Sequence, residues 1–183
     1  MLLLWILIAV AAILIIVFIS YYNRFAVLSN RIDNSLSQID VQLKRRADLI
    51  PNLVESVKGY MKHEKAAIKA VTDARKALVS GDLPSRIKAN DKLEGFLGKL
   101  FAIAENYPDL KANTNFLQLQ GELTTTEDKI AYSRQFYNDS ILSYNNICTT
   151  FPGSFFAGLY GRKQKEYLQI TESEKKVVKV DFG

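Results

Sequence analysis

Residues 2 to 19, LLLWILIAVAAILIIVFI, form an apolar run without one charged or polar side chain. As an α-helix this run is about 27 Å long, close to the thickness of the hydrocarbon core of a bilayer. Trp5 near its start and Tyr21 and Tyr22 after its end are typical of side chains at a membrane–water interface. We therefore expect residues 1–22 to be a transmembrane anchor. The predicted anchor residues are Leu3, Trp5, Ile8, Leu14, Ile16, Phe18, Tyr21 and Tyr22.

The alternative for this run is a cleaved signal peptide. No basic residue precedes the run, and the residues after it, SYYNRF, are bulky where a signal peptidase needs small ones. No cysteine lies near position 20, which argues against a lipoprotein signal. These features favour an uncleaved, single-pass anchor. Arg24 and Arg31 follow the run, so the positive-inside rule places the body of the protein in the cytoplasm and the N-terminus outside.

Composition bounds what the rest of the chain can be. Its 183 residues suit one folded unit with an appended segment, and its net charge of +5 is below what a nucleic-acid binder shows. We therefore expect no nucleic-acid partner. The single cysteine, Cys148, excludes an intramolecular disulfide and is interpreted as a small buried hydrophobe rather than a nucleophile.

Apolar residues recur every three or four positions from Phe25 to Leu78, which predicts helix rather than strand. The expected helix covers about residues 24–79 and continues from the anchor. Pro51 lies within it and removes the hydrogen bond to the carbonyl of Ala47. Because the apolar stripe stays in phase across Pro51, we favour a kink there over the end of one helix and the start of another.

Further helices are expected at about 85–106, 109–149 and 153–159, separated by the segments SGDLPSR, ENYP and FPG. Residues 161–183 lack a clear period and are expected to form a mostly extended tail, although Val178 and Val180 alternate as in a strand. The predicted class is all-α. We expect the transmembrane helix to continue into an elongated antiparallel bundle of the four-helix type, spanning residues 23–160.

A line of polar residues accompanies the apolar stripe of the first helix, and a Tyr-Asn pair recurs after seven residues at Tyr137 and Tyr144. The line consists of Ser35, Gln38, Gln42, Arg45, Asn52 and Ser56. Such side chains can fix helix register by hydrogen bonds across a bundle, or they can line a polar cavity. We favour the first interpretation, because uncharged amides alone do not make a reaction site.

Lys44, Arg45 and Arg46 form a basic cluster in the same helix. On an upright helix they lie roughly 25 residues, or about 37 Å, beyond the anchor, out of reach of the lipid surface potential. Two interpretations stay open: a solvated face paired with carboxylates such as Asp40 and Asp48, or a docking patch for another protein. The candidate interaction face is Gln38, Gln42, Lys44, Arg45 and Arg46.

Catalytic and metal-binding patterns are incomplete. His63 and Glu64 lack the second histidine that a zinc protease motif needs, and His63 is the only histidine in the chain. No glycine-rich phosphate loop is present, and adjacent carboxylates such as Glu127 and Asp128 point about 100° apart on a helix. We predict no enzyme activity, catalytic residue, cofactor or metal.

Three blocks of the sequence follow one another in order: YNRFAVLSNRIDNSLSQIDVQLKRRADLIPNLVESVKGYMKHE, AENYPDLKANTNFLQLQGELTTTEDKIAYSRQFYN and YNNICTTFPGS. These blocks resemble the LemA family of bacterial membrane proteins. The resemblance implies an anchored helical bundle at the bacterial inner membrane, with no catalytic residues to carry over. Magnetosome-associated members imply a role for some relatives in organising membranes.

Two functions are consistent with these features. The first is a non-enzymatic scaffold that organises protein assemblies at the membrane and self-associates. The second is an accessory or sensor subunit that regulates a membrane enzyme such as a protease, with Pro51 as a hinge. The expected partners are the lipid bilayer and further copies of the chain, with another membrane protein as an alternative.

Overall fold

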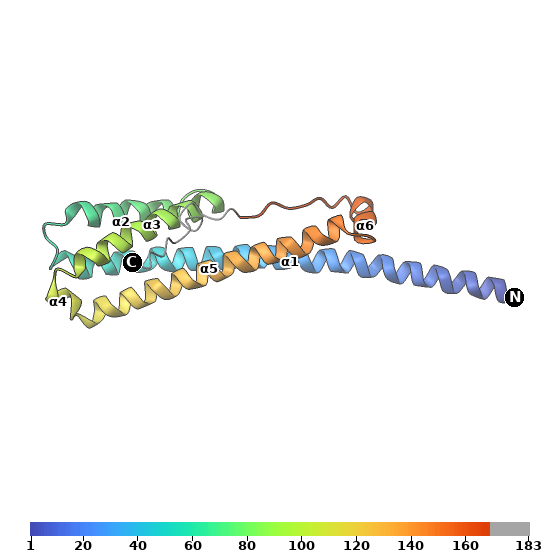
Figure 1. Cartoon of the computed structure of the whole chain (residues 1–183), viewed down its shortest axis with the longest axis horizontal. Coiled ribbons are helices and arrows are strands. Elements are labelled where there is room, and N and C mark those ends of the chain that lie inside the picture. The colour runs from blue at the N-terminus through green and yellow to red at the C-terminus, as the bar shows by residue number, and fades with distance from the viewer. Residues whose placement is uncertain (169–183) are drawn as a thin grey trace, which may run out of the picture. The chain divides into compact units, whose positions relative to one another are not determined.

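The computed structural model describes residues 1–168, and its regular elements in that range are helices (Figure 1). This confirms the predicted all-α class. The helices are α1 (Leu2–Lys58), α2 (Lys65–Leu78), α3 (Leu83–Ala104), α4 (Pro108–Lys111), α5 (Thr114–Thr149) and α6 (Gly153–Leu159). After a turn at Gly161 the chain has no regular structure up to Leu168. The rest of the expected extended tail, with Val178 and Val180, lies outside the described residues.

The chain divides into two compact units, which we describe separately. Unit 1 consists of Met1–Leu36 and Arg134–Tyr167, and unit 2 is built on Ser37–Ser133. Each of the two long helices, α1 and α5, contributes residues to both units.

Unit 2 buries the apolar stripes of its helices in one core. The antiparallel pair α2 and α3 forms one side of it (Figure 1). The loop between them contains Gly81 at φ +93°, in the left-handed region that favours glycine. The largest fully buried side chains of this unit are Ile39, Leu43, Ile50, Leu53, Met61, Leu78, Leu93, Leu100, Leu110 and Leu123.

Unit 1 has its own, smaller core where the early part of α1 meets the end of α5 and α6. Its buried members are Phe25, Leu28, Ile32, Ile141, Tyr144, Ile147 and Ala157. Gly153, the first residue of α6, is buried directly against Ile147, and a Cβ at this position would lie 2.4 Å from the carbonyl oxygen of Ile147. α6 therefore starts where only glycine fits.

The prediction of one helix over residues 24–79 was wrong. α1 ends at Lys58, and residues 59–64 form a turn before α2 begins at Lys65. Gly59 is a poor helix former, and the turn allows Met61, Val71 and Leu78 to be fully buried. Burial of each such side chain contributes about 1.5–3 kcal/mol, which outweighs the few helical hydrogen bonds lost, at about 1 kcal/mol each. The apolar period is the same in both helices and so does not reveal the turn.

The expected helix over residues 109–149 is also divided, into α4 and α5. Asn113 is the residue before α5, and the backbone N–H of Phe116 donates a 3.1 Å hydrogen bond to its Oδ1 atom. This is the geometry of a helix N-cap, which satisfies a backbone donor that the helix itself leaves free. The expected helices at 85–106 and 153–159 correspond to α3 and α6.

Pro51 lies inside α1, which continues through it to Lys58. The helix does not end there, whereas a kink at this residue stays a prediction. The carbonyl oxygen of Ala47, which cannot receive an N–H from Pro51, accepts a 2.8 Å hydrogen bond from Nε of Arg75 in α2. A side chain from a neighbouring helix thus replaces the backbone hydrogen bond that proline removes.

Candidate functional site

The predicted interaction face lies on the part of α1 that belongs to unit 2. Gln38, Lys44 and Arg45 are exposed, and Gln42 is half-buried. Asp40, expected as a partner of the basic cluster, instead forms an ion pair with Arg86 of α3. Asp40 therefore does not pair with this face, whereas Asp48, the other expected carboxylate, is exposed on α1.

Arg46 does not belong to this face, and its inclusion was wrong. Its exposed fraction is 2%, its Nη1 atom donates a 2.8 Å hydrogen bond to Oδ1 of Asn90, and it forms an ion pair with Glu127. Successive helix residues point about 100° apart, so Arg45 faces solvent while Arg46 enters the core. Asn90 and Glu127 lie far away in the sequence, on α3 and α5.

Burial lowers the pKa of Arg46 to about 10, and the nearby carboxylates Glu94 and Asp91 act in the opposite direction. The guanidinium therefore remains charged at neutral pH and joins α1, α3 and α5 in one polar cluster. Removing one member of such a cluster leaves a buried charge or amide without its partner, which is costly. The cluster contains a guanidinium, an amide and the Glu127 carboxylate, and the ion pair between Arg46 and Glu127 joins α1 to α5.

A role of the polar line on α1 in fixing helix register stays a prediction. Ser35 Oγ donates to the carbonyl of Arg31 and Ser56 Oγ to that of Asn52, both within α1. At neighbouring positions, the side chains of Asp40 and Arg46 form polar contacts with other helices.

The second Tyr-Asn pair lies in unit 1 and holds the segment that follows α6. The amide of Asn145 donates to the carbonyl of Lys165 and accepts from its backbone N–H, at 2.9 and 2.8 Å. The ammonium group of Lys165 lies 5.5 Å from the ring centroid of Tyr144. These contacts fix the chain after α6 against α5.

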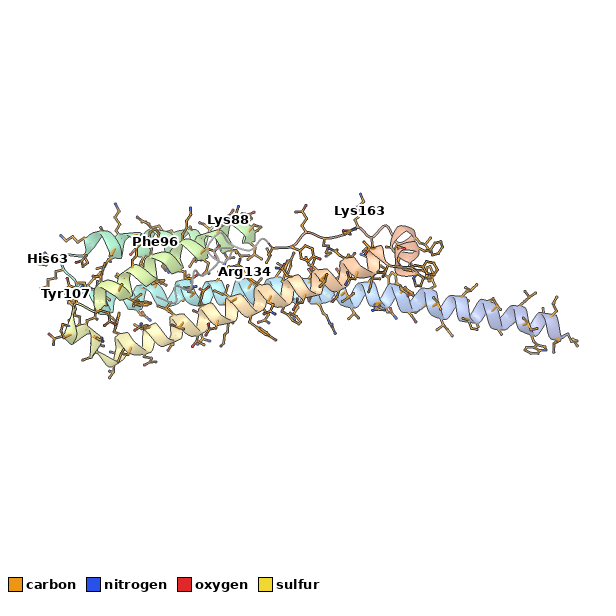
Figure 2. The ribbon with its side chains drawn as sticks, viewed as in Figure 1. His63, Lys88, Phe96, Tyr107, Arg134 and Lys163 are labelled. Carbon is orange, nitrogen blue, oxygen red and sulfur yellow. The ribbon has the colours of Figure 1, made fainter. Side chains whose placement is uncertain are left out.

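An open groove of about 950 Å³ lies beside the turn between α1 and α2, in unit 2. Figure 2 labels His63 at this turn. The groove is lined by Lys58, Met61, Lys62, His63, Lys65, Ile68, Lys69 and Thr72. Its cationic rim suits an acidic partner surface, but exposed lysines of this kind are also common on a solvated helix face. Sequence reasoning missed the groove, although the spacing of its lysines by three and four residues indicated a common face.

Cys148, interpreted from the sequence as a buried hydrophobe rather than a nucleophile, lies on α5. Cys148 is half-buried, and burial raises the pKa of its thiol, so little thiolate is available at neutral pH. Among residues 1–168 no three His, Cys, Asp or Glu side chains are placed to share a metal ion.

The predicted anchor residues lie on the early turns of α1, the one helix of residues 1–168 that is long and apolar enough to cross a membrane. Seven of them are exposed or largely exposed: Leu3, Trp5, Ile8, Leu14, Ile16, Phe18 and Tyr22. Tyr21 differs, because it is half-buried and stacks on Phe156 of α6 with ring centroids 4.6 Å apart. Leu3, Trp5, Ile8, Leu14 and Ile16 are large apolar side chains left exposed by the protein, as a lipid-facing segment requires, whereas Phe18 and Tyr22 also contact the ring of Tyr160.

Comparison with known proteins gives a consistent assignment. The chain is 29% identical to Protein LemA of Metamycoplasma hominis over 137 residues, which cover 74% of this chain and 63% of that protein. It is 27% identical to Magnetosome protein MamQ of Magnetospirillum gryphiswaldense over 173 residues, covering 80% and 64%. It is 26% identical to Magnetosome protein MamQ 2 of Paramagnetospirillum magneticum, covering 81% and 64%. The chain thus spans a little under two thirds of the length of these curated relatives.

The model of the LemA family matches residues 35–182. The match starts within α1, after the apolar segment, and includes the candidate interaction face, the polar cluster of Arg46 and the basic groove. Because the match covers well over half of the sequence, and the relatives agree with it, this chain belongs to the LemA family.

Proposed function

We propose that this chain is a membrane-anchored, non-enzymatic helical scaffold that organises protein assemblies at the bacterial inner membrane, in part by self-association. The observation that carries the proposal is the continuity of α1. One helix contains the exposed apolar segment and, further along, the buried residues Ile39, Leu43 and Ile50 of unit 2. A body whose core includes part of its own anchor helix is held at the membrane without a flexible linker.

The surfaces of unit 2 support docking rather than catalysis. Lys44 and Arg45 are exposed cations on α1, and the lysine-lined groove adds a second cationic surface in the same unit. Exposed charges of one sign favour association with acidic protein surfaces and accelerate it. The partners we propose are a second copy of the chain and another membrane protein, with the helical body in the cytoplasm.

The proposal is tested by reversing the charge of the exposed pair, with Lys44→Glu combined with Arg45→Glu. Arg46 stays unchanged, because its removal would disrupt the buried cluster. The matched control is Lys99→Glu with Lys129→Glu, which changes the same number of exposed charges on α3 and α5. Full-length proteins are extracted gently from native membranes and compared by mass photometry and cross-linking mass spectrometry.

We expect the first variant to lose oligomer mass or co-purifying protein, while the control retains both. Identical complexes from all three proteins would contradict the scaffold role of this face. A stoichiometric second protein in place of a homo-oligomer would favour the other function, an accessory or sensor subunit of a membrane enzyme such as a protease. That function is favoured by Pro51, where α1 depends on a side chain of α2 for a backbone hydrogen bond.

A further inference from the structure

The short helix α6 exposes apolar side chains on its outer side. Phe155 and Leu159, four residues apart and so on one face of the helix, have exposed fractions of 65% and 59%. Phe151, just before the helix, is 88% exposed. Large exposed apolar patches on a folded unit mark a surface that is covered in the working protein. We call Phe151, Phe155 and Leu159 the outer face of α6.

The opposite side of α6 is fixed to the early part of α1, within unit 1. Phe156 stacks on Tyr21, and the ring of Tyr160 makes an edge contact with Phe18 at a centroid distance of 5.1 Å. The hydroxyl of Tyr160 donates a 2.7 Å hydrogen bond to the carbonyl of Phe18. Tyr22 also meets Tyr160 edge-on. α6 is thereby placed against residues 18–25 of α1 (Figure 1).

This is the level at which the apolar segment of α1 ends. The uncharged run covers residues 2–19, and Arg24 is the first charged side chain of the sequence. A spanning helix needs about 20 apolar residues, so residues 18–22 come to lie at the boundary between hydrocarbon and headgroups. α6 packs beside these residues through its opposite side, so its outer face lies at the same boundary. Aromatic side chains are enriched in this layer.

The charges of this end of unit 1 suit an anionic lipid surface. No aspartate or glutamate occurs in residues 1–32 or in residues 140–165. The ionisable basic residues in these two ranges are Arg24, Arg31, Arg162, Lys163 and Lys165. Lys163, labelled in Figure 2, is exposed on the segment that leaves α6. An acid-free, basic region beside an apolar face is the composition of an interfacial membrane contact.

We propose that the outer face of α6 inserts into the interfacial layer of the bilayer that α1 enters, as a second, non-spanning membrane contact of the same chain. The occupant of this face is lipid: the apolar side chains enter the layer beneath the headgroups, and the basic residues closest to the end of the apolar run and to α6, Arg24, Arg162 and Lys163, lie near the headgroups. Two contacts at one boundary would fix the rotation of α1 and the tilt of unit 1 against the membrane. The inference rests on the proposed anchoring by α1.

A tryptophan reporter tests this in the full-length protein. Trp5 is the only tryptophan and lies in the apolar segment, so Trp5→Phe provides a silent background. In that background Phe155→Trp reports on the outer face of α6. Phe136→Trp is the control, an exposed aromatic position of α5 in the same unit, about 20 Å along the helix from its C-terminal end. The proteins are reconstituted in vesicles of phosphatidylcholine and phosphatidylglycerol, with or without bromine on the phosphatidylcholine acyl chains near the headgroup.

We expect a blue-shifted emission at position 155 and a loss of its intensity in brominated vesicles, with neither effect at position 136. The unmodified protein, which retains Trp5, tests the anchoring itself. Quenching of Trp5 together with an unquenched reporter at 155 would overturn the inference but not the anchor. An unquenched Trp5 would overturn the anchor as well.

The same reporter is also measured in nanodiscs that each hold one copy of the chain. A blue-shifted emission at position 155 that bromine does not quench would place this face against protein. That result would overturn the assignment of lipid as its occupant. Leu159→Trp is a second reporter on the same face, for the case in which Phe155→Trp fails to fold. It is expected to give the same quenching as position 155.

Discussion

At the scale of single residues, two adjacent arginines have opposite roles. Arg45 is exposed on α1, whereas Arg46 is buried with Asn90 and Glu127. Residue type and local spacing do not separate them, because both flank the same apolar stripe. The signal that could have found the cluster is the occurrence of Asn90 between the buried residues Ile87 and Leu93 of α3. A polar side chain in an apolar stripe predicts a buried partner.

Pro51 shows how a local defect is compensated by a distant residue. We predict that Arg75→Met lowers the free energy of unfolding by about 1.5–3 kcal/mol, because the carbonyl of Ala47 loses a hydrogen bond from a charged donor. Methionine keeps much of the aliphatic packing of arginine. In a Pro51→Ala background the same change should cost under about 1 kcal/mol, since the backbone at position 51 would then supply an N–H to the carbonyl of Ala47.

The measurement is urea unfolding of the four proteins in detergent, followed by far-ultraviolet circular dichroism. Arg75→Met lowers the free energy of unfolding by one amount in the unmodified chain and by another in the Pro51→Ala background. The difference between these two amounts is the coupling energy between residues 51 and 75. Equal costs with and without Pro51 would show that Arg75 does not replace the missing backbone hydrogen bond.

At the scale of elements, the presence of helices could be predicted from the sequence. The residues at which the helices begin and end were predicted less accurately. The expected ranges 85–106 and 153–159 correspond to α3 and α6, whereas the expected range 109–149 includes the break between α4 and α5. The apolar period missed the turn at residues 59–64, because Met61, Val71 and Leu78 keep the helical spacing across it. The break before α5 had a local signal in Asn113, an amide at a position where a helix can begin.

The docking of α6 depends on one glycine. Gly153→Ala should detach the helix, because its Cβ would lie 2.4 Å from the carbonyl oxygen and 2.8 Å from Cγ2 of Ile147. Gly158→Ala, in the same helix, has no heavy atom within 4 Å of the added Cβ and is the matched control. We expect chymotrypsin to cleave around residues 151–160 several-fold faster in the first variant, in line with a penalty of about 1–3 kcal/mol.

Limited proteolysis with mass spectrometry measures the cleavage rates in the full-length protein. The control should be cleaved no faster than the unmodified chain, because alanine favours helix over glycine. Equal rates in all three proteins would show that α6 tolerates a side chain at Gly153 and that its contact with Ile147 is looser than the geometry requires.

At the scale of the whole molecule, the positive-inside rule predicts the topology. Arg24 and Arg31 follow the apolar segment within the range that the rule considers. We expect proteinase K added outside spheroplasts to leave the chain at full length, and the same protease to digest the helical body in inverted membrane vesicles. A membrane protein with a known external domain controls for protease activity. Cleavage of the body from outside would reverse the proposed orientation.

The sequence by itself determined those properties that depend on residues close together along the chain. Two of these properties are the apolar run of residues 2–19 and the helical period, which predicted an anchored all-α chain. The incomplete catalytic patterns are a third local property. Only the tertiary structure decided which polar residues are buried, where the first long helix ends, and that α6 lies against residues 18–25 of α1. These outcomes depend on which helix faces meet, because the free energy of burial is gained between residues far apart in the sequence.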